Sequence, residues 1–473
     1  AQGVGVGEQV EALAQLAELV GREGRVTMAE LNRRGGGGHG GSGGYGDRED
    51  VAGTTNVYGS VKNPVTLGSG GGDGNTGSTY SGYDGGDGGG AVKLEANGTV
   101  TVNGTINANG GNGSDHSDWS GGGGAGGSIY IDAGTVTGTG SITANGGLGA
   151  DDGSTEGGAG GGGRVAIYYT TTYDTTTVEA KGGNDHSYNQ MGGAGTLFVK
   201  QDSATNGDLY ITGYGYIDDV ATTPQPETSL TFDTIKISNY ANYVVDSGET
   251  LNLASSTPAN GTLTINGTLD VPTTSTISDI GYFTNNGSIT TLTDLTISTG
   301  VNYYENGSTP SLTDLTVAGT VEVQDTSVTG SSWSLTNVTV NDGGSITHES
   351  NSTTHNDSLY LSISNNLTVN TGGSIDVEGK GFTEGEGPGG GASGQNDYGA
   401  VGATHAGIGG DGESPEGAVS GSTAVYGDVK VPEDLGSGGG PSGRSNAPGG
   451  SGGGAIKLEV TGTVTVDGTI SAD

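Results

Sequence analysis

Acidic side chains gather in three glycine-rich stretches, and the chemistry they offer is the binding of a hard cation. The acidic residues are Asp84 and Asp87 in the first stretch, Asp115 and Asp118 in the second, and Asp151, Asp152 and Glu156 in the third. Residues 110–115 and 146–151 fit Gly-Gly-x-Gly-x-Asp, a half-repeat that binds Ca²⁺ when it recurs every nine residues. Here the two copies lie 36 residues apart. Ca²⁺ bridging between stacked loops is therefore one interpretation, and solvated loop carboxylates are the other.

Asparagine supplies a second candidate chemistry, the attachment of glycans. Asn-x-Ser/Thr sequons occur at Asn97, Asn103, Asn112, Asn260, Asn266, Asn286, Asn306, Asn337, Asn351, Asn356 and Asn366. In a secreted protein such sites carry glycans only where they face solvent. Asn next to Gly is equally typical of turns and of stacked amide ladders, so both interpretations stay open.

Catalysis is the least supported of the chemistries. A polysaccharide hydrolase or lyase needs paired carboxylates across a groove, or Ca²⁺ with a basic side chain. The basic residues Arg164, Lys181, Lys200 and Lys236 are scattered along the chain. The six His residues are isolated, with no two-His spacing that suggests a metal site, and we expect them in loops. We therefore expect no enzyme, no catalytic residue and no cofactor other than possible Ca²⁺.

Composition bounds the partners and the core. Fifty-three acidic residues stand against fifteen basic ones, for a net charge of −38, which disfavours nucleic acid and anionic membranes as partners. There is no Cys, and no apolar run long enough for membrane insertion. Only 30% of residues are hydrophobic, too few for a thick globular core but enough for a slender solenoid. Disorder is the competing interpretation of so much Gly, but it does not account for the regular apolar alternation.

The elements that must position these residues are short repeated strands. Residues 98–111 read Gly-Thr-Val-Thr-Val-Asn-Gly-Thr-Ile-Asn-Ala-Asn-Gly-Gly, and closely similar sequences occupy 134–147 and 462–473. Ile106 and Ile142 match at a distance of 36 residues. Apolar and polar residues alternate in each copy, which predicts a strand with one buried face. A unit this short buries that face only by stacking on a copy of itself.

A more regular ladder is predicted over residues 206–380. Its expected strands centre on Ile237, Ile265, Ile297, Val317, Val340 and Val369. The five intervals span 132 residues, so we expect about 26 residues per turn of a β-helix. Residues 1–34 differ from the rest, because Val10, Leu13 and Val20 fall at helical spacing. They predict either an amphipathic cap over the first coil or a helix that docks on another subunit.

The most specific signal is a long internal repeat. Residues 57–64 and 67–72 recur as 425–432 and 435–440 at an offset of 368, and residues 91–95 recur as 455–459 at an offset of 364. The chain therefore ends inside the type of coil in which its β-region begins.

These motifs, together with 124–131 (Gly-Ala-Gly-Gly-Ser-Ile-Tyr-Ile) and 163–169 (Gly-Arg-Val-Ala-Ile-Tyr-Tyr), resemble the Gly-rich β-helical repeats of very large secreted surface proteins. Those are adhesin-like or fibre-forming chains of environmental bacteria and archaea. The resemblance covers residues 35–473 and implies an extracellular right-handed parallel β-helix with a structural or adhesive role. It brings no catalytic residue, and residues 1–34 depart from it.

We therefore expect an all-β fold: a right-handed parallel β-helix (β-solenoid) with long Gly-rich loops and a short N-terminal helical segment. The expected parts are 1–34 as a cap or docking segment, 35–205 as a Gly-rich solenoid, 206–380 as a regular ladder, and 381–473 as an incomplete second copy of the start.

The predicted function is that of a secreted or cell-surface structural subunit that assembles head to tail with copies of itself. The expected contact residues are Val10, Leu13, Val20, Val464, Val466 and Ile470. The alternative is a module of a giant adhesin that binds surface glycans or cells. A polysaccharide-degrading β-helix is the third possibility.

Overall fold

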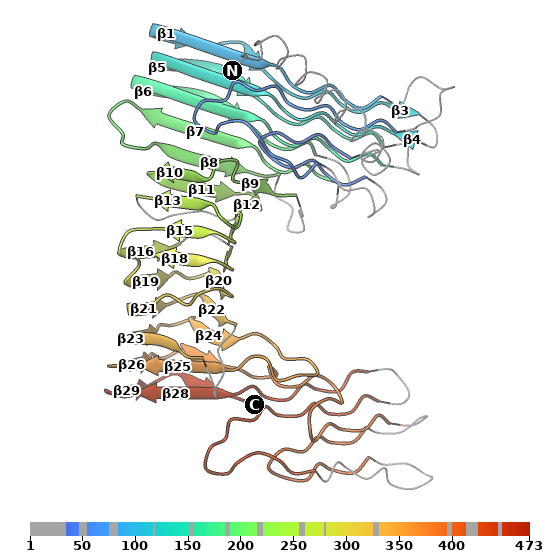
Figure 1. Ribbon diagram of the computed structural model, residues 1–473, viewed down its shortest axis with the longest axis vertical. Helices are drawn as coiled ribbons and strands as arrows, with labels where there is room; N and C mark the ends of the chain where they lie inside the picture. Colours follow the sequence, from blue (N-terminus) through green and yellow to red (C-terminus); the bar gives the residue numbers. More distant parts are fainter. Residues whose placement is uncertain are drawn as a thin grey trace, which may run out of the picture. The chain divides into compact units, whose positions relative to one another are not determined.

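The computed structural model describes residues 35–46, 54–74, 84–116, 119–151, 156–184, 190–214, 221–254, 261–278, 281–324, 331–394, 400–412, 424–442 and 447–473 (Figure 1). Within these ranges the protein is all-β, with mostly parallel sheets and no helix, which confirms the predicted class. No helix long and apolar enough to cross a membrane occurs in them. The helical prediction for 1–34 lies outside the described residues. The chain forms two compact units, Ala1–Thr228 with Ile235–Val244 (unit 1), and Ser229–Thr234 with Val245–Asp473 (unit 2).

Unit 1 is built on one large sheet in the order β1-β5-β6-β7-β8-β11, with β2 beside β5. Its strands are β1 (Ala91–Thr101), β2 (Thr105–Asn107), β3 (Asp115–His116), β4 (Trp119–Ser120), β5 (Ser128–Thr143), β6 (Arg164–Glu179), β7 (Thr196–Gln201), β8 (Asp208–Thr212), β9 (Thr223–Pro224), β11 (Thr234–Ser238) and β12 (Asn242–Val245). The pairs β1–β5, β5–β6 and β6–β7 are parallel, and β7–β8 is antiparallel. Ile106 lies opposite Ile142, so the predicted 36-residue match is a true strand register.

Parallel stacking places like residues above one another and so forms the core of unit 1. Ile129 and Val136 of β5 and Val165 and Ile167 of β6 are completely buried. They pack with half-buried apolar residues of β1, such as Val100. This is the stacking that the alternation of Val and Ile predicts.

The glycine-rich stretches of unit 1 are not open loops but form a hydrogen-bonded bundle. We call it the glycine bundle; its segments are 35–45, 66–73, 84–90, 107–114, 120–127, 143–151, 156–163, 179–184 and 190–195. In Figure 1 many of these segments run out from the ends of β1, β5 and β6. Chain approach is so close that a Cβ on Gly124 would lie 2.1 Å from the carbonyl oxygen of Asp87, and one on Gly160 2.0 Å from that of Gly124. Only glycine permits this spacing.

Hydrogen bonds in the bundle repeat every third residue. Along segment 120–127, the N–H groups of 121, 124 and 127 donate to segment 107–114, those of 122 and 125 to segment 66–73, and those of 123 and 126 to segment 156–163. Donors that return to the same neighbour after three residues define a threefold helix without internal hydrogen bonds, which is the polyproline II geometry. The sequence interpretation as bulging loops missed this order.

A buried arginine ties the start of the bundle to β6. Arg164 is fully buried, and its guanidinium donates to the carbonyl of Tyr58 at 2.9 Å, to that of His39 at 3.4 Å and to Thr196 Oγ1 at 3.1 Å. The His39 ring nitrogens lie 2.7 Å from the carbonyl oxygen of Gly126 and 2.7 Å from Thr66 Oγ1. Burial and the Arg164 charge lower the pKa of His39 to about 4, so this His is neutral. Contrary to the sequence expectation, His39 is a buried structural residue.

Unit 2 consists of three parallel sheets that the chain visits in turn. Its strands are β10 (Ser229–Phe232), β13 (Thr250–Leu253), β14 (Thr262–Ile265), β15 (Thr268–Asp270), β16 (Thr274–Ile277), β17 (Tyr282–Asn285), β18 (Ser288–Thr290), β19 (Asp294–Ile297), β20 (Asn302–Glu305), β21 (Leu312–Val317), β22 (Thr320–Val323), β23 (Trp333–Val340), β24 (Ser345–His348), β25 (Leu359–Ile363), β26 (Leu367–Val369), β27 (Ser374–Asp376), β28 (Ile456–Val460), β29 (Val464–Val466) and β30 (Thr469–Ser471). One sheet runs β10-β13-β15-β18, the second includes β14-β17-β20-β22-β24-β27-β30, and the third runs β16-β19-β21-β23-β25-β28, with β26 between β23 and β29.

All six predicted strand centres from Ile237 to Val369 fall in strands. The predicted interval of about 26 residues is wrong for the regular part. Residue 262 pairs with 282, 282 with 302, 274 with 294 and 294 with 314, so one circuit takes 20 residues there. Longer circuits follow, as 320 pairs with 345 and 345 with 374. The average concealed this change because the predicted centres belong to different sheets.

Candidate assembly interface

The last strands of unit 2 leave apolar side chains uncovered. β28, β29 and β30 each pair with one earlier strand, and no described strand of the unit covers their other edge (Figure 1). Val464, Val466 and Ile470 are 50%, 44% and 39% exposed. Their partners one layer earlier, including Val369 and Ile375, are fully buried. The side chains that continue the core rows therefore meet solvent here, and the strand edge offers unpaired backbone groups.

The first strands of unit 1 form a similar end. β1 pairs only with β5, and its exposed and half-buried residues alternate along almost its whole length. Val92, Leu94 and Val100 are half-buried, whereas the facing Ile129, Ile131 and Val136 of β5 are fully buried. Among the described strands, β1 is thus the edge strand of its sheet, with a partly covered apolar row.

These two ends are copies of one another. Residues 91–109 and 455–473 are identical at 13 of 19 aligned positions, and Val100, Val102 and Ile106 match Val464, Val466 and Ile470. An end that carries the β1 sequence therefore occurs twice. In unit 1 its β5-facing side is covered, and in unit 2 the corresponding side is open.

The copies extend into the glycine-rich segments, contact for contact. Gly68 N donates to the Gly89 carbonyl at 2.9 Å, and Gly436 N donates to that of Gly453 at 2.9 Å. The Tyr58 hydroxyl donates to the Leu67 carbonyl at 2.7 Å, as that of Tyr426 does to Leu435 at 2.6 Å. We call residues 35–109 the first module and residues 400–473 the second module.

The His–Tyr pair is also duplicated. The rings of His39 and Tyr58 lie 4.8 Å apart, and those of His405 and Tyr426 lie 4.7 Å apart. The glycine that follows each Tyr has a positive φ, 81° at Gly59 and 92° at Gly427. The structure therefore repeats a whole module, and not only a strand sequence.

What differs is the cover. In the first module, Gly86 N and Gly89 N donate to the carbonyls of Gly122 and Ala125 in segment 120–127. The equivalent N–H groups of Gly450 and Gly453 donate to no described residue. The buried Nε2 of His405 likewise lacks a hydrogen-bond partner in the described part of the chain. The second module is thus an uncovered copy of a surface that is covered elsewhere in the protein.

Charges at the two ends also match. Lys93 pairs with Glu95 at 2.9 Å and Lys457 with Glu459 at 3.4 Å, all four being partly exposed. The Lys93 ammonium lies 5.1 Å from the Tyr130 ring centroid, and that of Lys457 lies 4.3 Å from the ring of Tyr360. A hydrogen bond from the Tyr360 hydroxyl lowers the pKa of Glu459, with Lys457 contributing, which keeps this carboxylate ionised. Each end therefore presents one cation and one anion in fixed order.

The acidic stretches come close together without forming a described metal site. Gly113 N donates to the Leu148 carbonyl at 2.9 Å, so the two Gly-Gly-x-Gly-x-Asp segments do lie side by side. Asp84 and Asp87 are exposed, and Asp151 bridges Glu156 through the backbone. Asp118, Asp152 and the side chain of Asp115 lie outside the described residues. Among the described side chains, no three His, Asp or Glu come close enough to hold a metal ion.

Several sequon asparagines are part of amide ladders. Asn286 Nδ2 donates to Asn266 Oδ1 at 2.8 Å, Asn306 Nδ2 to Asn286 Oδ1 at 3.1 Å, and Asn337 Nδ2 to Asp314 at 2.8 Å. Asn351 is buried, with its Nδ2 bonded to two carbonyls. A glycan attaches to Nδ2 and would displace these bonds.

The other sequons divide into three groups. Asn103, Asn112 and Asn366 accept backbone N–H bonds through Oδ1. Asn97 and Asn356 are exposed, and Asn260 lies outside the described residues, as do the predicted contact residues Val10, Leu13 and Val20.

Comparison of the chain with protein-family models, with curated proteins and with solved structures found no match.

Proposed function

We propose that this chain is a secreted structural protein, a right-handed parallel β-helix that assembles head to tail into filaments. The observation that carries the proposal is the duplicated end: the uncovered strands β28–β30 repeat the sequence and contacts of the edge strands β1 and β2. Rotation of the chain through three parallel sheets supports the β-helix, because only a coiling chain returns to each sheet in turn.

The joint would continue the stacking seen inside each unit. β28–β30 of one copy would pair in parallel with β1 and β2 of the next, placing Val464 over Val100 and Ile470 over Ile106. Full burial of a Val or Ile side chain is worth about 1.5–3 kcal/mol, so covering three half-exposed side chains contributes about 3 kcal/mol from one side of the joint. New backbone hydrogen bonds add to this.

The symmetry of such a joint favours filaments. The two contacting surfaces are on opposite ends of the chain, so the contact is heterologous, and a heterologous contact that does not close into a ring propagates. The charge of −38 fits this function because it keeps the sides of the subunits apart, which directs association to the ends.

Light scattering and electron microscopy over a wide range of protein concentration test the proposal. We expect rods that lengthen with concentration. The variant Val464→Thr/Val466→Thr/Ile470→Thr should stay short at every concentration. A matched control is Ile408→Thr/Val429→Thr/Val431→Thr, which changes apolar residues that are equally exposed but lie outside the end strands. Equal lengthening of the first variant and the wild type, or no rods from the wild type, would refute the proposal.

A further inference from the structure

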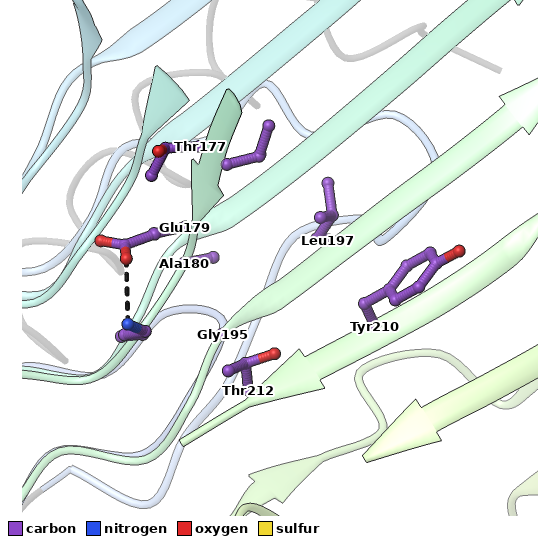
Figure 2. A pocket seen from close by; sticks show the side chains of 9 residues that line it. Thr177, Glu179, Ala180, Gly195, Leu197, Tyr210 and Thr212 are labelled. Atoms are coloured by element: carbon purple, nitrogen blue, oxygen red, sulfur yellow. Dashed lines mark hydrogen bonds and ion pairs between the residues drawn. The ribbon is translucent and has the colours of Figure 1, made fainter. Parts of the chain in front are cut away.

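Unit 1 contains a hollow that the assembly does not use. Its volume is about 230 Å³, and it lies where β6 ends beside β7 and β8 (Figure 2). Thr177 and Glu179 of β6 and Lys181 just beyond it line one part, and Leu197 of β7 with Tyr210 and Thr212 of β8 line the other. Figure 2 shows Glu179 with its dashed contact on one side and Tyr210 beyond Leu197 on the other. A volume of this size suits one sugar ring.

The polar groups of the hollow are held in place before any ligand arrives. Lys181 Nζ lies 2.9 Å from Glu179 Oε1, and Asn145 Nδ2 donates to Glu179 Oε2 at 3.1 Å. The bond from Lys181, with that from Asn145, lowers the pKa of Glu179, so the carboxylate is ionised. A carboxylate offers about four acceptor positions, and these two bonds use only part of them. Glu179 can therefore accept further hydrogen bonds without losing its supports.

Tyrosine rings supply the apolar part of the site. The Tyr210 ring has the Lys236 ammonium 5.3 Å from its centroid, which fixes its orientation. The nearby Tyr169 and Tyr173 rings pack with centroids 5.7 Å apart, and both add to the raised pKa of Tyr210 after burial and Asp208. Tyr214 lies against Lys181 at 5.4 Å. Tyr combines a flat apolar face with a hydroxyl, which is what the alternating C–H and O–H groups of a sugar ring require.

We propose that this hollow binds a neutral hexopyranose unit. Charge decides among ligand classes. A single carboxylate lines the hollow, which is too little for a metal ion. An acidic sugar would be repelled by the net charge of −38. A zwitterion would have to break the Glu179–Lys181 pair, whereas hydroxyl groups use the acceptor and donor positions that the pair leaves over. The site is separate from the end strands, so it does not depend on the proposed assembly.

Ligand-observed NMR with the full-length chain tests this inference. The probes are the methyl glycosides of glucose, galactose, mannose and N-acetylglucosamine, with glucuronate as the charged comparison. A ligand of this size at ordinary binding efficiency has a Kd of about millimolar. Glu179→Gln keeps the shape of the side chain, and Tyr210→Ala removes the ring. Tyr282→Ala removes a similarly exposed Tyr from unit 2 and serves as the matched control.

We expect at least one neutral glycoside to bind, and both hollow variants to weaken its binding about tenfold or more, with Tyr282→Ala unchanged. Glucuronate should bind at least about tenfold more weakly than methyl glucoside. Thermal unfolding of each variant shows whether the fold is retained, and Glu179→Gln decides the question if Tyr210→Ala unfolds. Absence of binding by all four glycosides, binding unchanged in Glu179→Gln, or equal binding of glucuronate would overturn the inference.

Discussion

The most quantitative prediction concerns Glu305, a carboxyl group buried in the core of unit 2. It is fully buried and accepts hydrogen bonds from the Tyr303 hydroxyl, from Asn285 Nδ2 at 2.8 Å and from Gly307 N at 3.1 Å. No cation is among these partners. Burial therefore outweighs the hydrogen bonds and raises the pKa of Glu305 from 4.5 to about 7.

The sign of the pH effect follows from this shift. The folded state holds its proton more tightly than the unfolded state between pH 4.5 and about 7. The Glu305 contribution to stability is therefore fully present below pH 4.5 and is lost as the pH rises through about 7. A difference of 2.5 pKa units (7 − 4.5) corresponds to about 3 kcal/mol. Ionisation of Glu305 should thus cost the folded chain about 3 kcal/mol above the raised pKa.

Glu305→Gln tests this reasoning, because the amide cannot ionise. Its oxygen can accept the bonds from Asn285 and Gly307, and its NH₂ group can donate to the Tyr303 hydroxyl. Urea unfolding followed by fluorescence gives the free energy of unfolding of both proteins at each pH. The two should be similar near pH 4.5, and the variant should be more stable above the raised pKa, by up to about 3 kcal/mol. A stability difference that does not change with pH would refute the account of Glu305.

Three further variants test the packing by thermal unfolding. Gly124→Ala places a Cβ 2.1 Å from a carbonyl oxygen and should destabilise unit 1 by more than the roughly 1–3 kcal/mol typical of overpacking, whereas Gly104→Ala, with nothing within 4 Å, should be neutral; equal effects would contradict the close-packed bundle. Arg164→Met leaves two buried carbonyls without their donor and should cost about 3 kcal/mol or more; a neutral result would show that Arg164 is not a clamp. Asn286→Ala interrupts the amide ladder and should cost about 1 kcal/mol; no loss would show that the ladder adds nothing.

Sequence periodicity predicted the strands well because side-chain alternation is written in the residue types. Ile106 and Ile142 were matched from sequence and lie opposite each other. The circuit of 20 residues escaped because several sheets share one apolar pattern. The end residues Val464, Val466 and Ile470 were predicted as contacts from the long repeat, and their exposure agrees with an uncovered layer.

The glycine bundle could not be predicted in the same way. Its order comes from backbone hydrogen bonds with a period of three, and glycine has no side chain to record that period. The buried pair of His39 and Arg164 was missed because its members lie 125 residues apart and only the bundle brings them together. The hollow beside Glu179 was missed for a similar reason, since its lining comes from three strands.

Disulfide trapping tests the central claim most directly, because the chain has no Cys of its own. Neighbouring parallel strands lie about 4.8 Å apart, within the range that a disulfide bridges. Thr465 is the copy of Thr101, and Thr101 faces Thr137 in β5. We mix a size-tagged Thr465→Cys chain with untagged Thr101→Cys or Thr137→Cys chains under mild oxidation. In-register head-to-tail pairing predicts a mixed dimer with Thr101→Cys and none with Thr137→Cys. Failure to trap the Thr101→Cys dimer, or trapping of the Thr137→Cys dimer in its place, would contradict it.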